Sequence, residues 1–383
     1  MRVLHIMSGS DPVHGGPVTA LRGLAEAQAS EGVQTSILAT FVKGSDTSVL
    51  SDARLRGVNV HLVGPSRGRR DLHPALSNVV DHLVADAQIV HIHGLWQEIQ
   101  HQAAKFAQRH GVAYIIRPCG MLSPWALSQG RIRKRAYMLW RLRRTLNRAG
   151  AIHFTSASER DLARPHRLRA PVIVEPNGVD FCEFDALPRR GTMRARYKIP
   201  PERLVVLYLG RLHPKKGLHL LIPAFARAPS HNATLVIAGP DEGGYRGRLE
   251  AMVDRHNLRH QVVFTGMVAR EDRVAAFLDA DVFVLPSHDE NFGVTVVESL
   301  AAGTPVIISD QVGIHEQVMS ARVGSVTPSR VDPLAEQLTR WLSDPDLRRS
   351  TADRARAFAW AHFDWRQIAR RWTEHYTRLC RQA

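Results

Sequence analysis

Residues 285–309 read LPSHDENFGVTVVESLAAGTPVIIS, and this stretch decides the fold. It continues an apolar strand at 281–285, passes through a polar loop, and enters a helix expected from about Gly293. The turn at 302–305 then leads into a second apolar strand at 306–308. A strand, a helix and a second strand in this order predict a βαβ unit. Its loop is therefore expected at the carboxyl edge of a parallel sheet, where α/β folds bind ligands.

Two carboxylates flank the start of this helix, Glu290 in the loop and Glu298 inside the helix. Phe292, Gly293 and Val294 lie between them, so backbone N–H groups at the helix N-terminus are expected to face the ligand. Carboxylates accept hydrogen bonds from hydroxyls, and N–H groups donate to ligand oxygens. The loop therefore suits a sugar joined to a phosphate, although two glutamates at this spacing also arise by chance on a solvated surface.

The pattern of a glutamate, seven residues and a second glutamate, followed by Gly303-Thr304-Pro305-Val306, resembles the retaining family 4 (group 1) glycosyltransferases of GT-B fold. The resemblance is to members of the exopolysaccharide and lipopolysaccharide type. It implies two Rossmann-like, doubly wound parallel-sheet domains that face a central cleft. It also implies that Glu290 contacts the donor sugar and that Glu298 binds the ribose of the nucleotide.

Composition agrees with an enzyme of this size. The chain has 383 residues with 44% hydrophobic content, which suits two domains and two cores. We expect a cytoplasmic protein, because the sequence shows no signal peptide, no membrane-spanning run, and three cysteines without disulfide or metal spacing. The formal net charge of +15 points to an anionic partner such as a nucleotide, an acidic lipid surface or nucleic acid.

Strands alternate with helices along the whole chain, which predicts α/β domains with parallel sheets. In the first half, strands are expected at 3–7, 35–39, 58–63, 89–93, 114–116 and 152–155. In the second half they are expected at 204–209, 234–238, 261–264, 282–285 and 306–308. The segment Pro176-Asn177-Gly178-Val179-Asp180 matches the one that closes the N-terminal domain of the resembling family.

We therefore expect three parts. Residues 1–187 form an acceptor-side domain, and residues 188–358 form the nucleotide-sugar domain. A C-terminal helix at 359–383 crosses back onto the first domain, as the resemblance implies.

Donor-phosphate residues are expected on both halves. The glycines that precede the first helix allow close approach to a phosphate, and the resemblance makes Gly16 the best match, although a turn alone also requires glycine. Arg211 and Lys216 flank a tight turn after the first strand of the second half. A planar guanidinium with a mobile ammonium is a common pairing for diphosphate, and the resembling family uses these two positions for it. Together with Glu290 they are the expected catalytic residues.

The nucleotide base is expected near the ends of the next two strands, where Gly239, Met267 and Val268 would line its pocket through their backbone. Two Asp-X-Asp triplets, at 279–281 and 344–346, are possible metal-binding motifs. We interpret them as a strand entry and a helix-capping turn. No metal and no cofactor are expected, because GT-B enzymes generally need no metal for catalysis.

Acceptor-side residues are expected in the first half. His91 and His93 point to the same face of one strand, but no third metal ligand stands near them, so His93 is assigned to the acceptor pocket instead. The segment from Arg117 through Cys119 and Gly120 looks like the acceptor loop of the resembling family. Many relatives carry histidine where this chain has Cys119, and a neutral thiol is a poor partner for a sugar hydroxyl. Arg117 is the candidate that would compensate.

Residues 131–148 carry eight Lys or Arg and no acidic residue. Apolar residues recur at spacings of three and four, which predicts a basic amphipathic helix. Such a helix is typical of a membrane surface element, and it is equally compatible with a core-packed helix that has a solvated basic face. Nucleic acid is not expected, because no recognised nucleic-acid module is present.

The most consistent function is a retaining glycosyltransferase that moves a hexosyl unit from a nucleoside diphosphate sugar to a glycan or lipid-linked acceptor. It would act in cell-surface polysaccharide synthesis, in the cytoplasm or peripherally at the inner face of the membrane. A nucleotide-sugar epimerase of the same fold would convert the donor without an acceptor. A non-catalytic basic protein that binds membrane or nucleic acid would leave Arg211, Lys216, Glu290 and Glu298 without a joint purpose.

Overall fold

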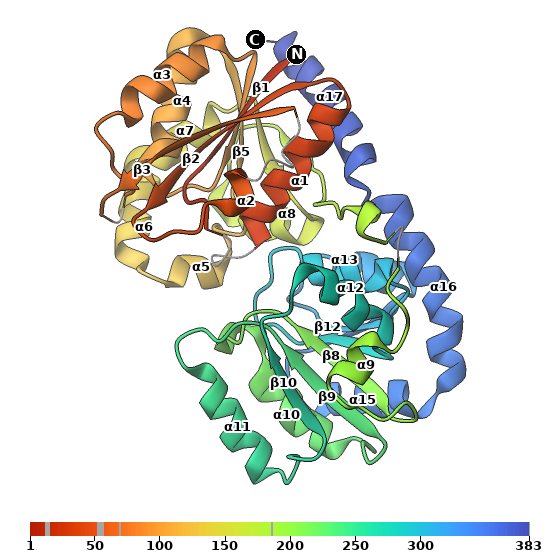
Figure 1. Cartoon of the computed structure of the whole chain (residues 1–383). Coiled ribbons are helices and arrows are strands. Elements are labelled where there is room, and N and C mark those ends of the chain that lie inside the picture. The colour runs from red at the N-terminus through yellow and green to blue at the C-terminus, as the bar shows by residue number, and fades with distance from the viewer. Residues whose placement is uncertain (12–15, 52–56, 69, 185–186, 383) are drawn as a thin grey trace. The chain divides into compact units, whose positions relative to one another are not determined.

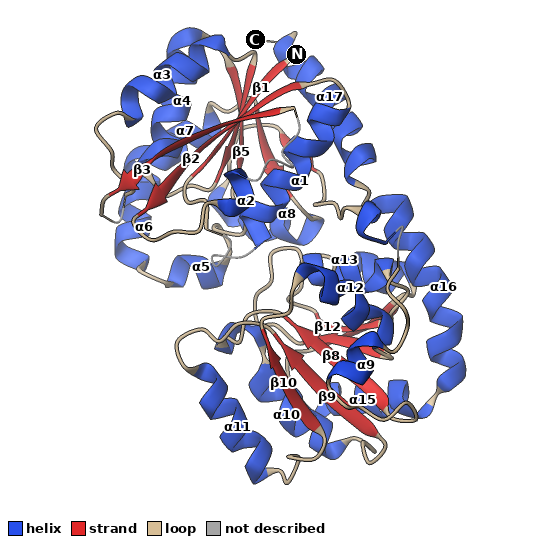
Figure 2. Cartoon of the chain, in the orientation of Figure 1, coloured by secondary structure: helices blue, strands red, loops and turns tan. Residues whose placement is uncertain are grey.

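The computed structural model of the chain describes residues 1–11, 16–51, 57–68, 70–184 and 187–382. The chain divides into two compact units (Figure 1). Unit 1 is Met1–Gly178 with Trp365–Ala383, and unit 2 is Val179–Asp364. Each is built on a parallel sheet flanked by helices (Figure 2). The chain thus leaves unit 1, forms unit 2, and returns to unit 1 with its last helix.

The sheet of unit 1 has the strand order β3-β2-β1-β4-β5-β6-β7, and neighbouring strands pair in parallel. Its central strands are apolar and buried because helices cover both faces. The order reverses between β1 and β4, the kind of switch point at which doubly wound sheets bind ligands. The strands are β1 (Arg2–Met7), β2 (Gln34–Val42), β3 (Val58–Ser66), β4 (Ile89–His93), β5 (Ala113–Arg117), β6 (Ala151–Phe154) and β7 (Val172–Val174).

Helices of unit 1 follow its strands, and α17 joins them from the end of the chain. Figure 1 shows α17 (blue) beside α1 (red). Trp372 and Tyr376 of α17 are fully buried in this unit. The helices are α1 (Gly16–Ser30), α2 (Ser48–Ser51), α3 (Leu76–Asp86), α4 (Glu98–His110), α5 (Pro124–Ser128), α6 (Arg131–Tyr137), α7 (Arg143–Asn147), α8 (Ala157–Ala163) and α17 (Trp365–Cys380).

The sheet of unit 2 repeats the scheme with the order β10-β9-β8-β11-β12-β13. Its switch point lies between β8 and β11, which pair in parallel. The strands are β8 (Leu204–Leu209), β9 (Ala233–Ala238), β10 (Val262–Gly266), β11 (Val282–Leu285), β12 (Val306–Ser309) and β13 (Gly324–Thr327). The helices are α9 (Thr192–Arg196), α10 (Leu218–Arg227), α11 (Tyr245–Arg255), α12 (Arg270–Asp279), α13 (Val294–Ala301), α14 (His315–Ala321), α15 (Val331–Ser343) and α16 (Pro345–His362).

The predicted βαβ unit is present as β11, α13 and β12, and the other expected strands are found within a few residues of their predicted ends. Strands β7 and β13 were not predicted, because Val172–Val174 has only three residues and Gly324–Thr327 is short and weakly apolar. The single helix expected near the C-terminus is instead the pair α16 and α17, which are interrupted at residues 363–364.

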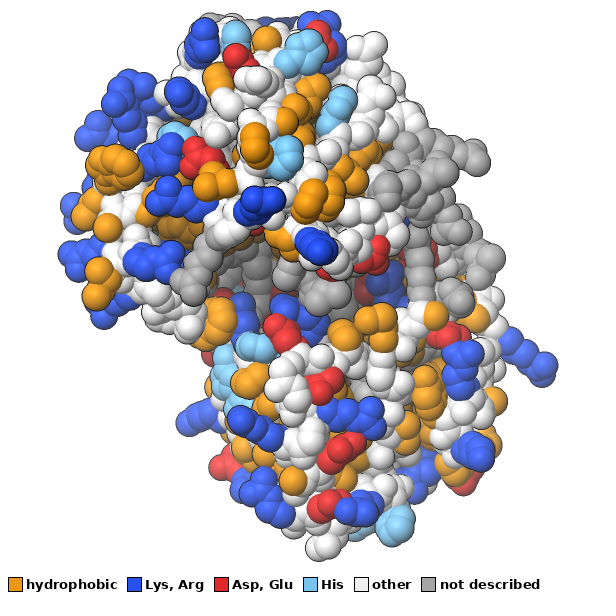
Figure 3. Space-filling model, turned by 60° about the vertical axis from the view of Figure 1, so that its left-hand side comes forward, with side chains coloured by type: hydrophobic (Ala, Val, Ile, Leu, Met, Phe, Trp, Pro, Cys, Tyr) orange, Lys and Arg blue, Asp and Glu red, His pale blue; other side chains and the backbone are white. Residues whose placement is uncertain are grey.

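The basic segment at 131–148 is not one regular helix. Its middle is a π-helical turn, η2 (Met138–Leu142), between α6 and α7. The wider turn changes the phase of the apolar residues, so Leu142 and Leu146 pack in the core while Ile132 and Leu139 point to solvent. The prediction of one continuous apolar stripe was therefore wrong. Cationic and hydrophobic side chains lie next to one another at the surface in Figure 3.

The Asp-X-Asp triplets are structural, as interpreted from the sequence. Asp279 is buried and accepts hydrogen bonds from backbone N–H groups at the start of α9, including that of Met193 at 2.8 Å. Asp281 accepts from the N–H of Val205 and pairs with Arg194. Asp344 caps α16 by accepting from the N–H of Leu347.

None of the described helices has the length and apolar character that crossing a membrane requires.

Candidate functional site

The carboxyl edge of the unit 2 sheet brings the two predicted catalytic loops together. Lys216 lies in the turn η5 (Pro214–Lys216) after β8, and Glu290 lies in the loop after β11. Because β8 and β11 are neighbours, both loops leave the sheet at the same point. The Nζ of Lys216 forms an ion pair with the Oε2 of Glu290. A second pair lies beside it, with 2.7 Å between Lys215 Nζ and Asp289 Oδ2.

The backbone of Glu290 is fixed by two hydrogen bonds to the segment that follows β12. Its N–H donates to the carbonyl of Gln311 at 3.0 Å, and its carbonyl accepts from the N–H of Gly313 at 2.9 Å. Burial alone would raise the pKa of the Glu290 carboxyl, but the charges of Lys216, Lys215 and Arg211 outweigh it and hold this pKa below its ordinary value. Glu290 is thus an ionised acceptor in a cationic setting.

Gly217 is what allows the two loops to approach so closely. Its φ is +75°, and a Cβ atom built on it would lie 2.0 Å from the carbonyl oxygen of Pro286. No residue larger than glycine fits at this point without moving the backbone. The N–H of His288 also donates to the carbonyl of Lys215 at 2.8 Å, so the loops are joined by a backbone hydrogen bond.

Arg211 lies at the same edge but is held by a residue that the sequence did not reveal. Its Nη1 is 2.7 Å from Oε2 of Glu242, and the Arg211 side chain is about one-third exposed. The hydroxyl of Tyr208 donates to the Arg211 carbonyl at 2.8 Å. Arg211 therefore contributes charge near Glu290 without contacting it in this state, and an anionic ligand would compete with Glu242 for its guanidinium.

Glu298 lies on α13 with a buried side chain, close to Arg273 of α12. The distance from Arg273 Nη2 to Glu298 Oε1 is 3.3 Å. Arg273 also pairs with Glu183 at 3.1 Å. The negative charge of Glu298 raises the pKa of the Arg273 guanidinium, and this effect is larger than the lowering that burial causes. Arg273 was missed at the sequence level, because a single arginine in a charged helix carries no signal.

The remaining predicted donor-side residues surround these loops. Phe292 is buried and packs edge-on against Phe363, while Gly293 with φ +95° caps α13 and Val294 begins it. Gly239 follows β9, and its N–H donates to the carbonyl of Gly266 at 2.8 Å.

The two side chains expected near the base differ in exposure. Met267 is 72% exposed, whereas Val268 packs partly against the core. A ligand at this edge could therefore reach the side chain of Met267 more readily than that of Val268.

In unit 1, Gly16 is the first residue of α1 and is exposed. The rest of the glycine loop before it, residues 12–15, lies outside the described residues.

Arg117 and the acceptor loop that follows it are tightly bonded. Arg117 ends β5, is 2% exposed, and donates from Nη2 to Oδ1 of Asn177 at 2.6 Å. Cys119 adopts φ +55°, and burial raises the pKa of its thiol, so the thiol is neutral. The N–H of Gly120 donates at 2.7 Å to Oε1 of Glu159, a buried residue on α8 that the sequence did not single out.

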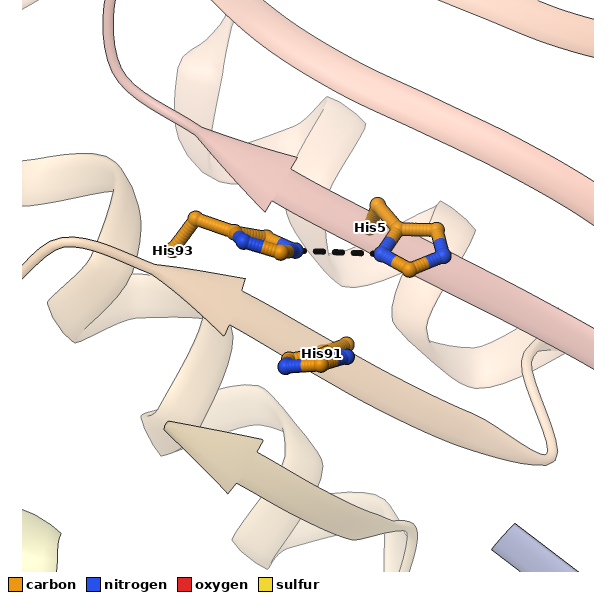
Figure 4. A group of neighbouring side chains, drawn as sticks. All are labelled: His5, His91 and His93. Carbon is orange, nitrogen blue, oxygen red and sulfur yellow. Dashed lines mark hydrogen bonds between the residues drawn. The ribbon is translucent and has the colours of Figure 1, made fainter. Parts of the chain in front are cut away.

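His93 belongs to a buried cluster of histidines, shown in part in Figure 4. His5 of β1 lies opposite His91 of β4 in the sheet, and its Nδ1 is 3.1 Å from Nε2 of His93. The rings of His91 and His93 stack with centroids 4.5 Å apart. The expectation that no third histidine stands near was therefore wrong: strand pairing brings His5 to the same face, and ring nitrogens of His5, His91 and His93 lie within 4.8 Å of one another.

Comparison with known families covers most of both units. Residues 189–358 match the family described as glycosyl transferases group 1, and residues 15–178 match the glycosyl transferase 4-like domain. The residues that form the Lys216–Glu290 pair and the Arg273–Glu298 pair all lie in the first of these matches.

Individual proteins agree with these matches. An uncharacterized glycosyltransferase of Methanocaldococcus jannaschii is 34% identical over 51% of this chain and 50% of its own. The alpha-D-kanosaminyltransferase of Streptomyces kanamyceticus is 26% identical over 83% of this chain and 78% of its own. The chain spans about half the length of most of the curated relatives it matches.

Among solved structures, Anabaena HepE in complex with UDP and glucose superposes with a TM-score of 0.81 at 22% identity, covering 98% of this chain and 99% of that one. This likeness shows the fold. It agrees with the two parallel-sheet α/β units described above.

Proposed function

Because this chain belongs to the group 1 glycosyltransferases of GT-B type, we propose that it transfers a hexosyl unit from a nucleoside diphosphate sugar to a hydroxyl group of a glycan or lipid-linked acceptor. The observation that carries this proposal is the Lys216–Glu290 ion pair at the switch point of the unit 2 sheet, with Arg211 at the same edge. A half-buried cation beside an ionised carboxylate offers one partner for a diphosphate and one for sugar hydroxyls.

The donor would be held as follows. Arg211 and Lys216 bind the diphosphate, and Glu290 with the backbone of Phe292, Gly293 and Val294 positions the sugar. The departing diphosphate gains negative charge as its bond to the anomeric carbon breaks, and fixed cations stabilise that charge. We assign no metal to this step, because Arg211, Lys216 and the neighbouring Lys215 supply positive charge at the same edge.

The nucleoside would lie at the other side of the same loops. Glu298 accepts hydrogen bonds from the ribose hydroxyls, and Gly239, Met267 and Val268 border the base. We place Gly16 near the donor phosphates, and His93, Arg117, Cys119 and Gly120 on the acceptor side. The anomeric configuration is proposed to be retained, and the product to enter cell-surface polysaccharide.

We further propose that residues 131–148 hold the enzyme at the inner, anionic face of a membrane. Ile132, Leu139 and Trp140 are exposed by 86%, 64% and 80%. Exposed arginines precede and follow them in the sequence, and such a mixture of cations and apolar side chains binds at an anionic lipid surface.

The basic residues of this segment divide into two groups. Lys134 and Arg141 are turned toward the protein, where Lys134 donates to the carbonyl of Ala126 and Arg141 pairs with Glu98. The lipid-facing charge is therefore assigned to the exposed arginines Arg131, Arg133, Arg135, Arg143 and Arg144. Arg148 is exposed too, but it donates to Oε1 of Gln108 at 3.1 Å and is left out of this group.

The experiment is a donor screen on the full chain. Thermal shift across UDP- and GDP-sugars identifies the donor, and NMR of the reaction then follows the anomeric proton with candidate glycan acceptors. We expect stabilisation by one nucleotide class and a product with the donor's anomeric configuration. Conversion of the donor sugar without any acceptor would favour an epimerase, and no response to any nucleotide sugar would contradict the proposal.

A further inference from the structure

Buried side chains in unit 1 form a continuous hydrogen-bonded chain that ends at His93, and the proposed transfer assigns no role to its other members. It runs through strands β1, β4 and β6 and through helices α1 and α17. Every ring in it is at most 1% exposed. Its members, in order, are the Glu175 carbonyl, His153, His91, Tyr376, Gln28, His5 and His93.

The direction of each hydrogen bond follows from the first one. The carbonyl of Glu175 can only accept, so Nε2 of His153 carries the proton of their 2.8 Å bond. A neutral imidazole has one N–H and one lone pair, so Nδ1 of His153 accepts from Nε2 of His91 at 3.2 Å. Nδ1 of His91 must then accept, and the hydroxyl of Tyr376 donates to it at 2.8 Å.

The same reasoning assigns the donor and the acceptor of each remaining hydrogen bond, from Tyr376 to His93. The Tyr376 oxygen accepts from Nε2 of Gln28 at 3.2 Å, and Oε1 of Gln28 accepts from Nε2 of His5 at 2.8 Å. Nδ1 of His5 is therefore the acceptor, and Nε2 of His93 donates to it at 3.1 Å. The assignment leaves His93 with a lone pair on Nδ1, at the end of the chain.

Burial keeps these imidazoles neutral. It lowers the pKa of His5 to about 4, and it lowers the pKa of His91, His93 and His153 well below the ordinary value, with the positive charge of Arg117 adding to the effect. This assignment of donors and acceptors also argues against a metal ion at His5, His91 and His93, although their ring nitrogens lie within 4.8 Å of one another. The lone pairs of His5 and His91 already accept hydrogen bonds, and stacked rings do not aim them at one point.

Two buried nitrogens remain at the end of this chain. Within the described residues, Nδ1 of His93 and Nε of Arg117 have no hydrogen-bond partner. The residues are direct neighbours, because His93 of β4 pairs with Arg117 of β5 in the sheet. One nitrogen needs a donor and the other, an N–H, needs an acceptor, and a buried polar atom without a partner destabilises the folded state.

We propose that His93 and Arg117 form a buried subsite for a single hydroxyl group, which donates to Nδ1 of His93 and accepts from Nε of Arg117. A hydroxyl is the smallest group that offers a donor and an acceptor on one atom. It belongs either to an ordered water or to an acceptor substrate. Only the second source rests on the proposed function, because the subsite itself follows from the hydrogen-bond order.

The test is NMR of the full chain labelled with ¹⁵N-histidine, with signals assigned by single His→Gln variants. Long-range ¹H–¹⁵N correlations distinguish a protonated ring nitrogen from one with a lone pair. We expect the proton on Nε2 in His5, His91, His93 and His153, and a His93 Nδ1 signal shifted as in a hydrogen-bond acceptor, either in the free protein or once the probe sugar is added. A proton on Nδ1 of His93, or an Nδ1 signal that stays at the position of an unbonded nitrogen in every sample, overturns the proposal.

Two variants locate the effect. Arg117→Met removes the Nε donor and is expected to move the His93 Nδ1 signal toward the unbonded position. Arg109→Met changes an exposed arginine of α4 that takes no part in this hydrogen-bonded chain and is the matched control, so it should leave that signal in place. If the two variants affect His93 alike, the subsite is not where we place it.

A last arm identifies the source of the hydroxyl. The spectrum is repeated with UDP alone and with UDP plus methyl α-D-glucopyranoside as a probe sugar. A His93 Nδ1 signal that moves only with the sugar indicates a substrate hydroxyl. A signal that stays in its hydrogen-bonded position throughout indicates a resident water, which a crystal structure of the free protein should then show between the two nitrogens.

Discussion

Lys216 and Glu290, which are 74 positions apart in the chain, form an ion pair where the loops after β8 and β11 meet. Both side chains are less than one-fifth exposed. The pair therefore gives the site a defined charge geometry before any ligand arrives. It also means that a nucleotide phosphate must share Lys216 with Glu290, or take its place.

This pair predicts a particular pattern of stability. Lys216→Ala leaves a mostly buried carboxylate without its cation and should lower the free energy of unfolding by about 2 kcal/mol, between the values for surface and buried pairs. The double variant Lys216→Met/Glu290→Gln removes both charges and should recover most of that loss while remaining inactive. Urea unfolding of the wild type, Lys216→Met, Glu290→Gln and the double variant completes the cycle, and additive losses in the double variant would show that the two residues do not interact.

Glu298 and Arg273 should act together on donor affinity. Glu298→Gln is expected to raise the donor KM about tenfold with kcat nearly unchanged, because a hydrogen bond of a charged group to ribose is lost in ground and transition states alike. Arg273→Met should raise KM in the same direction, and the double variant should be less than additive.

The matched control for that pair is Glu183→Gln, which alters the other carboxylate on Arg273 and should change KM less than either variant. A collapsed kcat with unchanged KM in Glu298→Gln would instead give this residue a role in the chemical step.

The basic surface at 131–148 should bind anionic vesicles in a salt-dependent way. Changing Arg133, Arg135 and Arg144 to Gln should weaken binding about a hundredfold, since each cation near an anionic leaflet contributes about 1 kcal/mol. Added salt should weaken the wild type in the same direction. Trp140→Ala should reduce binding to neutral and anionic vesicles alike.

The matched control removes the same charge from another exposed helix, with Arg246, Arg248 and Arg255 of α11 changed to Gln. Co-sedimentation compares the two triple variants. Equal binding by both would assign the interaction to net charge and not to this surface.

The histidine chain of unit 1 should make the protein acid-sensitive. The pKa of His5 is lowered to about 4 in the folded state, so the unfolded state binds protons more readily below its ordinary pKa of 6.5. Stability is therefore present above pH 6.5 and is lost as the pH falls toward 4. At pH 5 the loss from a group with this shift is about 2 kcal/mol.

The groups that face this chain include Arg117, whose charge opposes protonation, and Tyr376. Urea unfolding at pH 7 and pH 5 measures the loss, and His5→Gln should show a smaller difference between the two pH values than the wild type. An equal difference in both proteins would mean that His5 titrates normally.

Much of the scaffold could be predicted because its signals are local. Apolar runs with intervening helices indicated the two parallel sheets, and the GT-B fold is confirmed by the solved structures. The spacing from Glu290 to Glu298, with Gly303-Thr304-Pro305-Val306, indicated the group 1 family, which the family matches confirm. In both cases neighbouring residues in sequence carried the information.

What could not be predicted depends on strand order and on side chains from distant segments. His5 and His91 become neighbours only because β1 pairs with β4. The contact of Glu242 with Arg211, and that of Glu159 with Gly120, each join segments more than 30 positions apart. The π-helical turn at 138–142 changes which face of the helical segment is apolar, and its sequence gives no signal of that change.

The most direct test of the proposed function is the initial rate of nucleoside diphosphate release, measured with subsaturating donor and an accepted glycan. Arg211→Ala and Lys216→Ala should each lower this rate about a hundredfold or more, because they remove cations that stabilise the departing diphosphate. Arg246→Ala, which removes an exposed cation on α11, should leave it unchanged. If Arg211→Ala or Lys216→Ala stays folded and keeps a rate close to that of the wild type, the proposed role of these cations is contradicted.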